Sequence, residues 1–189
     1  SNSISFAMTL VSILPIIFIL EIFTVIGLSF FSTRVSGVVA VGLFLFYSLM
    51  NGLFFGVITL AYPIGTIAAA FFATFITFAV MAVYGFVTKQ DLTKFGTIAM
   101  FGLFGLIVAS IINLFAASSA LDWFITYFGL GIFIVLTAFD NQKIKNMAAA
   151  AEMSGRSTSF AIRGALMLYL DFINIFIYIL RILGGSSRK

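Results

Sequence analysis

A stretch of 54 residues, 35–88, contains no Asp, Glu, Lys or Arg. About a quarter of the residues in a soluble domain are charged, so this stretch is not typical of one. A membrane-crossing helix needs about 20 apolar residues, and the stretch is long enough for two crossings. Over the whole chain 62% of the residues are hydrophobic and only 8% are charged. The sequence therefore predicts an all-α, polytopic transmembrane helix bundle.

Continuous apolar runs separated by short polar connections predict six hydrophobic helices. They are expected at residues 6–31, 38–61, 64–87, 95–117, 123–144 and 164–185, with a tight turn at 118–122 and the longest polar connection at 147–158. Gly52 and Gly56 have the GxxxG spacing that lets another transmembrane helix approach closely. We expect residues 1–189 to form a single domain.

The composition limits the chemistry open to this chain. It contains no Cys and no His, which excludes disulfides, thiolate metal sites and the side chain that usually titrates near neutral pH. Phosphate-binding and membrane-protease motifs are also missing, so we expect a protein that is not an enzyme and has no cofactor. The net charge of +4 comes from short loops, so we expect the lipid bilayer, and not nucleic acid, as a partner.

Basic residues predict the orientation. The connections after the first, third and fifth expected helices contain Lys or Arg, whereas those after the second and fourth contain none. By the positive-inside rule, the first group faces the cytoplasm. Its members are Arg34, Lys89, Lys94, Lys143, Lys145, Arg156 and Arg163. If the last helix spans, Arg181, Arg188 and Lys189 emerge outside, against the rule, so both a spanning and a re-entrant last segment stay open.

The last expected helix has one polar face. At 3.6 residues per turn, its polar residues fall on one side and apolar residues cover the others. The polar side contains Gly164, Asp171, Asn174, Tyr178 and Arg181. Because a carboxylate at the bilayer centre costs about 2.5–3.5 kcal/mol on insertion scales, we expect this helix to be central in the bundle. Asp171 is either a functional carboxylate or a structural one tied to Asn174, Arg163 or the backbone.

Two further carboxylates lie in apolar segments. Asp140, near the end of the fifth expected helix, is the candidate partner of Asp171, or else a helix-end carboxylate paired with Lys143. Glu21 is near mid-depth in the first expected helix, as a functional group or as a protonated core residue. Two neighbouring carboxylates in a low-dielectric site cannot easily both ionise, and they titrate as a unit.

Several segments resemble the Bax inhibitor family of membrane proteins, also called the transmembrane Bax inhibitor motif family. LYLDFINIFIYILRILG at 168–184 is similar to the family signature, and LTAFDNQKIK at 136–145 is similar to a second family segment, with Phe139 where Tyr is common. SALDWFITYFGLGIF at 119–133 and YGFVTKQDL at 84–92 resemble it too. Members have seven helices, so we expect the family's first helix to be missing here, truncated or absent in a shortened member.

The resemblance implies a function for the two membrane aspartates. In members, two aspartates that match Asp140 and Asp171 form a hydrogen-bonded pair that senses pH and gates a calcium leak. The resemblance therefore predicts a pH-sensitive calcium-leak channel, with calcium and protons as its ligands and a weak calcium site at Asp140 and Asp171. An Arg that engages the pair in the closed state is matched only approximately by Arg34. The candidates for pore or gate support are Glu21, Arg34, Asn174 and Arg181.

Two other functions stay open. Bacterial members are similar to proteins that restrain a membrane protease, and eukaryotic members act against cell death. The chain could therefore be a regulatory protein that binds a membrane protease or another stress partner and transports no ion. Its aspartates would then stabilise the bundle, and the GxxxG helix or the 147–158 connection would bind the partner. A proton-coupled exchanger is the third possibility. The short soluble parts favour a bacterial plasma (inner) membrane.

Overall fold

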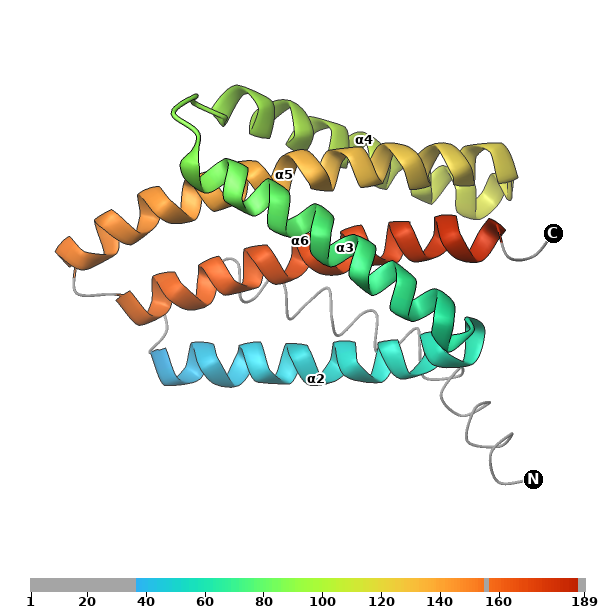
Figure 1. The fold of residues 1–189 in the computed structure, drawn as a ribbon, viewed down its shortest axis with the longest axis horizontal. Helices are drawn as coiled ribbons and strands as arrows, with labels where there is room; N and C mark the ends of the chain where they lie inside the picture. Colours follow the sequence, from blue (N-terminus) through green and yellow to red (C-terminus); the bar gives the residue numbers. More distant parts are fainter. Residues whose placement is uncertain (1–36, 155–156, 187–189) are drawn as a thin grey trace. The chain divides into compact units, whose positions relative to one another are not determined.

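The computed structural model describes residues 37–154 and 157–186, and within these ranges the chain is helical apart from short connections (Figure 1). Five helices are described. They are α2 (Gly37–Ala61), α3 (Ile64–Val87), α4 (Thr93–Ala116), α5 (Ser119–Ser154) and α6 (Ser157–Ser186). The helix expected at 6–31 lies outside the described residues, together with Glu21 and Arg34.

Four segments in the described part of the chain are long and apolar enough to cross a membrane. They are Ile64–Val87, Thr93–Ala116, Ser119–Ala148 and Phe160–Gly185. The predicted fold class, a polytopic helical membrane protein, is therefore confirmed. The last segment is one uninterrupted helix, so α6 has the length to span and does not bend back within its described residues.

The prediction of a polar connection at 147–158 is wrong over most of that range. Helix α5 continues to Ser154, and α6 already begins at Ser157. Four consecutive alanines, followed by Glu152, occupy the end of α5. Alanine and glutamate have high helix propensity, which explains why the helix continues through this segment.

The turn expected at 118–122 is also shorter than predicted. Helix α4 ends at Ala116, and Ala117 adopts a left-handed conformation with φ of 47°. The backbone oxygen of Asn113 accepts a hydrogen bond from the Ala117 amide at 2.9 Å, and its side-chain oxygen accepts one from the Ser118 amide at 3.0 Å. These bonds satisfy groups at the helix end, so α5 can begin directly at Ser119.

The chain divides into two compact units. One contains α2 and the segment Ala150–Leu166, and the other, the four-helix unit, contains Gly65–Ala149 and α6 from Met167 onward. In the first unit Gly52 and Gly56 are exposed, and no described atom lies within 4 Å of a side-chain carbon placed at either residue. The close helix approach predicted from their GxxxG spacing is therefore not seen among the described residues.

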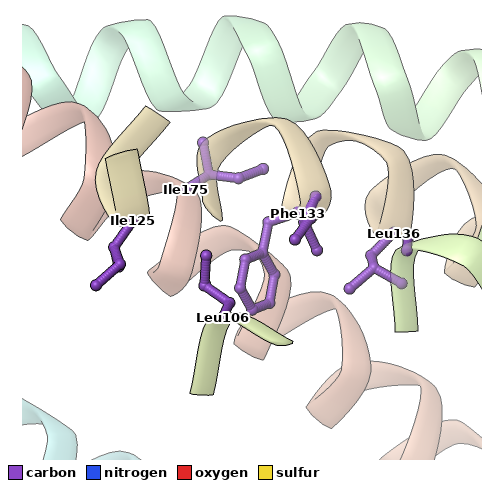
Figure 2. Packing of buried hydrophobic residues seen from close by; sticks show 7 residues of the cluster. Leu106, Ile125, Phe133, Leu136 and Ile175 are labelled. Carbon is purple, nitrogen blue, oxygen red and sulfur yellow. The ribbon is translucent and has the colours of Figure 1, made fainter. Parts of the chain in front are cut away.

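The core of the four-helix unit is built mainly from α5. Its buried apolar cluster comprises Ala99, Leu106, Ile125, Ile132, Phe133, Leu136 and Ile175. Figure 2 shows Leu106 of α4, Phe133 of α5 and Ile175 of α6 close to one another. Within an 18-residue apolar stretch of the α5 span 39% of the residues are buried, against 28% in such a stretch of α6 and 11% in those of α3 and α4. The central position expected for the last helix is thus shared with α5.

Candidate functional site

Helices α5 and α6 pack antiparallel in the four-helix unit (Figure 1). Near the start of α5, the Trp123 ring lies against Gly185, close to the end of α6. Further along α5, the ring of Phe133 lies 6.1 Å from the ring of Tyr178. This register places Asp122 and Arg181 at one end of the helix pair, and Asp140 and Asp171 toward the other. We call the end with Asp122 and Arg181 the outer end and the end with Asp140 and Asp171 the inner end. The α3–α4 connection, whose lysines are expected to face the cytoplasm, is bonded to α5 at the inner end.

Asp171 is the most unusual residue of the inner end. Its side chain is buried, with 3% of the residue exposed, and its Oδ2 atom has no hydrogen-bond partner among the described residues. Asn174, one of the partners considered from the sequence, donates its amide to the Leu170 carbonyl at 2.8 Å. A buried polar atom without a partner carries its full desolvation cost, so the Oδ2 atom of Asp171 is costly to bury.

Asp140 lies at the inner end of α5 and is half-buried. Its charge acts on Asp171, but no hydrogen bond between the two carboxyl groups is present in the described structure. The ammonium group of Lys143 forms no ion pair with Asp140 either, and lies 5.6 Å from the centre of the Phe139 ring. The charge of Lys143 still acts on Asp140, but no described residue forms an ion pair or a hydrogen bond that joins the two carboxyl groups.

Two glycines hold the backbone of α5 just before Asp140. A side-chain carbon on Gly85 of α3 would lie 2.0 Å from the Ala138 carbonyl oxygen, and one on Gly96 of α4 would lie 2.3 Å from the Phe139 ring. Only glycine permits these approaches, since any larger residue would overlap with α5. Helices α3 and α4 thus fix the position from which Asp140 projects.

Gln142 fastens the α3–α4 connection to α5, and the sequence analysis did not single it out. Its side-chain oxygen accepts a hydrogen bond from the Leu92 amide at 2.9 Å, and its side-chain nitrogen donates to the Gln90 carbonyl at 2.7 Å. One side chain therefore satisfies two backbone groups about 50 positions away in the sequence. The only signal in the sequence was a Gln placed two residues after Asp140.

The same connection is held at two further points. The ammonium group of Lys145 donates to the Phe86 carbonyl at 2.9 Å, at the C-terminal end of α3, where a positive charge is favourable. Asp91 accepts hydrogen bonds from the Thr93 hydroxyl at 2.6 Å and from the Thr93 amide at 2.9 Å. The hydrogen bond from the hydroxyl and, to a smaller extent, the one from the amide hold the pKa of the exposed Asp91 below its usual value.

The outer end has the opposite arrangement of charges. Arg181 of α6 donates a hydrogen bond to the Asp122 carboxylate near the start of α5, and the two form an ion pair. Both side chains are partly exposed, at 35% and 48%. The pair anchors the end of α6 beside the α4–α5 turn, on the side opposite to the lysines. This geometry favours the spanning path for the last helix over the re-entrant one.

One further polar side chain lies near Asp140 on the same helix. The hydroxyl of Thr137, close to Asp140 on α5, donates to the Phe133 carbonyl of its own helix at 2.7 Å. Within residues 37–154 and 157–186 no three acidic side chains gather into a group that could hold a metal ion. Among the described residues, the acidic side chains that a calcium site could use there are those of Asp140 and Asp171.

Comparisons with known proteins place this architecture in a family. A family model described as "Inhibitor of apoptosis-promoting Bax1" matches residues 2–188. The chain is 41% identical over 171 residues to the inner membrane protein YbhL of Escherichia coli strain K12, covering 88% of this chain and 72% of that protein. It is 40% identical over 182 residues to an uncharacterized protein of Deinococcus radiodurans, covering 96% of this chain and 78% of that protein.

These relatives confirm two expectations from the sequence. The named relative is an inner membrane protein of a bacterium, in agreement with the predicted location in a bacterial plasma membrane. The family model covers both aspartates of the inner end and the whole of α6. The chain therefore belongs to the Bax inhibitor family of integral membrane proteins.

Proposed function

We propose that this protein is a pH-sensitive calcium-leak channel in which Asp140 and Asp171 form the gate. The observation that carries the proposal is the buried Asp171 carboxyl group, whose Oδ2 atom has no hydrogen-bond partner among the described residues. A carboxylate is costly inside a membrane and is found there mainly where it serves a proton or ion pathway. A second carboxyl group, that of Asp140, lies within electrostatic reach of it.

The gate would operate through the proton shared between the two aspartates. With one proton on the pair, a short O–H···O⁻ bond can form and tie α5 to α6. When that proton leaves, two like charges repel in a low-dielectric site, and the helices separate or a cation enters. Calcium is a hard cation that prefers oxygen ligands. Two carboxylates bind it weakly enough for release, as permeation requires.

Calcium flux into liposomes, measured across pH, tests this function. For the unchanged protein we expect the flux to rise with pH, because deprotonation opens the gate. In the double variant Asp140→Asn/Asp171→Asn we expect the flux to lose its pH dependence, since neither amide titrates. The matched control is Asp122→Asn, which makes the same chemical change at the outer end and should keep the pH dependence.

The result also separates the competing functions. If the double variant keeps the pH dependence of the unchanged protein, the gate does not lie at these aspartates. If the purified protein passes no calcium at any pH, the regulatory function through a membrane protease or stress partner is favoured instead. Flux that follows an opposing proton gradient would indicate a proton-coupled exchanger. No catalytic step and no cofactor belongs to the proposed function.

A further inference from the structure

Four lysines gather at the inner end of the four-helix unit. Two belong to the α3–α4 connection and the first turn of α4, and two belong to α5. They are Lys89, Lys94, Lys143 and Lys145. They share one region because Gln142 bonds to the backbone at residues 90 and 92, and because Lys145 bonds to the carbonyl of Phe86. The contacts therefore bring together charges that are about 50 residues apart in the chain.

The four ammonium groups are not equally available. That of Lys145 is hydrogen-bonded and lies 5.2 Å from the centre of the Phe86 ring, and that of Lys143 lies over Phe139. Lys89 and Lys94 are both exposed, and no described residue forms an ion pair or a hydrogen bond with either side chain. Two positive charges at this end of the unit therefore have no partner in the described part of the chain and can bind an external anion.

The acidic side chain beside them offsets only part of this charge. Asp91 lies between Lys89 and Lys94 in the sequence, and its Oδ1 atom accepts two hydrogen bonds from Thr93 and forms no ion pair with either lysine. Asp140 lies deeper, half-buried in α5. The four lysines and Asp91 together leave a net positive charge at the surface.

Exposed apolar side chains directly adjoin the free lysines. Four residues of α3 and α4 that flank the connection are each more than half exposed: Phe86, Val87, Phe95 and Ile98. In a protein that spans the membrane, such a surface faces acyl chains. A positive charge next to an acyl-chain surface matches a phospholipid, which combines a phosphate headgroup with apolar chains.

We infer that Lys89 and Lys94 form a binding site for the headgroup of an anionic phospholipid at the inner end of the four-helix unit. The phosphate of the headgroup lies between the two free ammonium groups, and the acyl chains lie against the exposed side chains of α3 and α4. Lys145 and Gln142 do not bind the lipid directly. They hold the α3–α4 connection in place, so that the two lysines project from a fixed backbone.

Native mass spectrometry of the purified protein with added phospholipids tests this site. We expect phosphatidylglycerol to remain bound where phosphatidylcholine, which has the same chains and no net charge, is lost. Each basic residue near a membrane surface contributes about fivefold in affinity. In Lys89→Gln/Lys94→Gln we therefore expect phosphatidylglycerol retention to fall by about 25-fold. The matched control is Arg188→Gln/Lys189→Gln, which removes the same net charge from the C-terminal tail and should leave retention unchanged.

Several outcomes would contradict the inference. Equal retention of the two lipids by the unchanged protein would show that binding does not depend on headgroup charge. This comparison needs no variant. Unchanged retention in the lysine variant, or an equal loss in the tail control, would place the site elsewhere or nowhere. Displacement of the lipid by inorganic phosphate at equal concentration would show that the free anion, and not the lipid, is bound. Lys89→Arg/Lys94→Arg should retain the lipid, which separates loss of charge from loss of fold.

Discussion

The two ends of the α5–α6 pair differ in what surrounds their carboxyl groups. At the outer end Asp122 has a cation, Arg181, in direct contact, and both side chains reach toward water. At the inner end Asp140 lies near a second carboxyl group, that of the buried Asp171, whose Oδ2 atom has no hydrogen-bond partner in the described part of the chain. One end is neutralised by a direct ion pair, whereas at the other end no described cation contacts the buried Asp171.

This difference predicts which end can respond to conditions. The outer pair is complete, so its loss should cost little and should depend on salt. At the inner end the Oδ2 atom of Asp171 has no partner among the described residues, so the folded protein carries a cost there that protonation would reduce. Sites that keep such a cost are typical of function and not of stability.

Asp171→Leu should therefore produce the largest change, and it should stabilise the protein. The substitution removes a buried polar group that lacks a partner and replaces it with an apolar side chain of similar volume. We expect the free energy of unfolding in mixed micelles to rise by about 3 kcal/mol. The proposed gating should be lost in the same variant.

The matched control for this variant is Asn174→Leu on the same helix. The Asn174 amide already donates to the Leu170 carbonyl, so its replacement removes a satisfied group and should bring no comparable gain. If Asp171→Leu destabilises the protein as strongly as a cavity would, then Asp171 has a stabilising partner, and the contrast between the two ends fails.

The membrane helices could be predicted from the sequence because long apolar runs mark the segments that cross a bilayer. The apolar runs at 64–87 and 38–61 have nearly the same bounds in α3 and α2. The error at 147–158 has the opposite cause. Hydrophobicity predicts where the membrane segment ends. The helix can continue further if the next residues have high helix propensity, and the alanine run extends α5 to Ser154.

The site could be predicted only in part. Asp140 and Asp171 were recognised because a charge in an apolar helix is rare. Gln142 and Asp122 were not singled out, because polar residues near helix ends are common and their partners lie 50 and 59 residues away. Such partners depend on the antiparallel register of the helices, and one sequence gives no measure of that register.

Gln142→Leu should have the next largest effect, this time destabilising. It removes both hydrogen bonds that join α5 to the α3–α4 connection, next to the inner end. We expect a loss of about 1–2 kcal/mol in the free energy of unfolding, together with faster hydrogen exchange at the Leu92 amide. The control is Gln90→Leu, which leaves the Gln90 carbonyl in place. Equal effects of the two substitutions would show that the side chain of Gln142 does not fasten this connection.

The smallest effect is expected at the outer end, from a double-mutant cycle of Arg181→Gln and Asp122→Asn. Because both side chains are partly exposed, the coupling energy should be about 0.5 kcal/mol and should shrink as salt is raised from 0.1 M to about 1 M, where the screening length falls to about 3 Å. The cycle subtracts the separate effects of each substitution, so it isolates the pair. A coupling that is several times larger and insensitive to salt would mean that the outer pair is as desolvated as Asp171. The two ends would then differ only in the sign of their partners, and the exchange of a proton or cation could not be assigned to the inner end on grounds of burial.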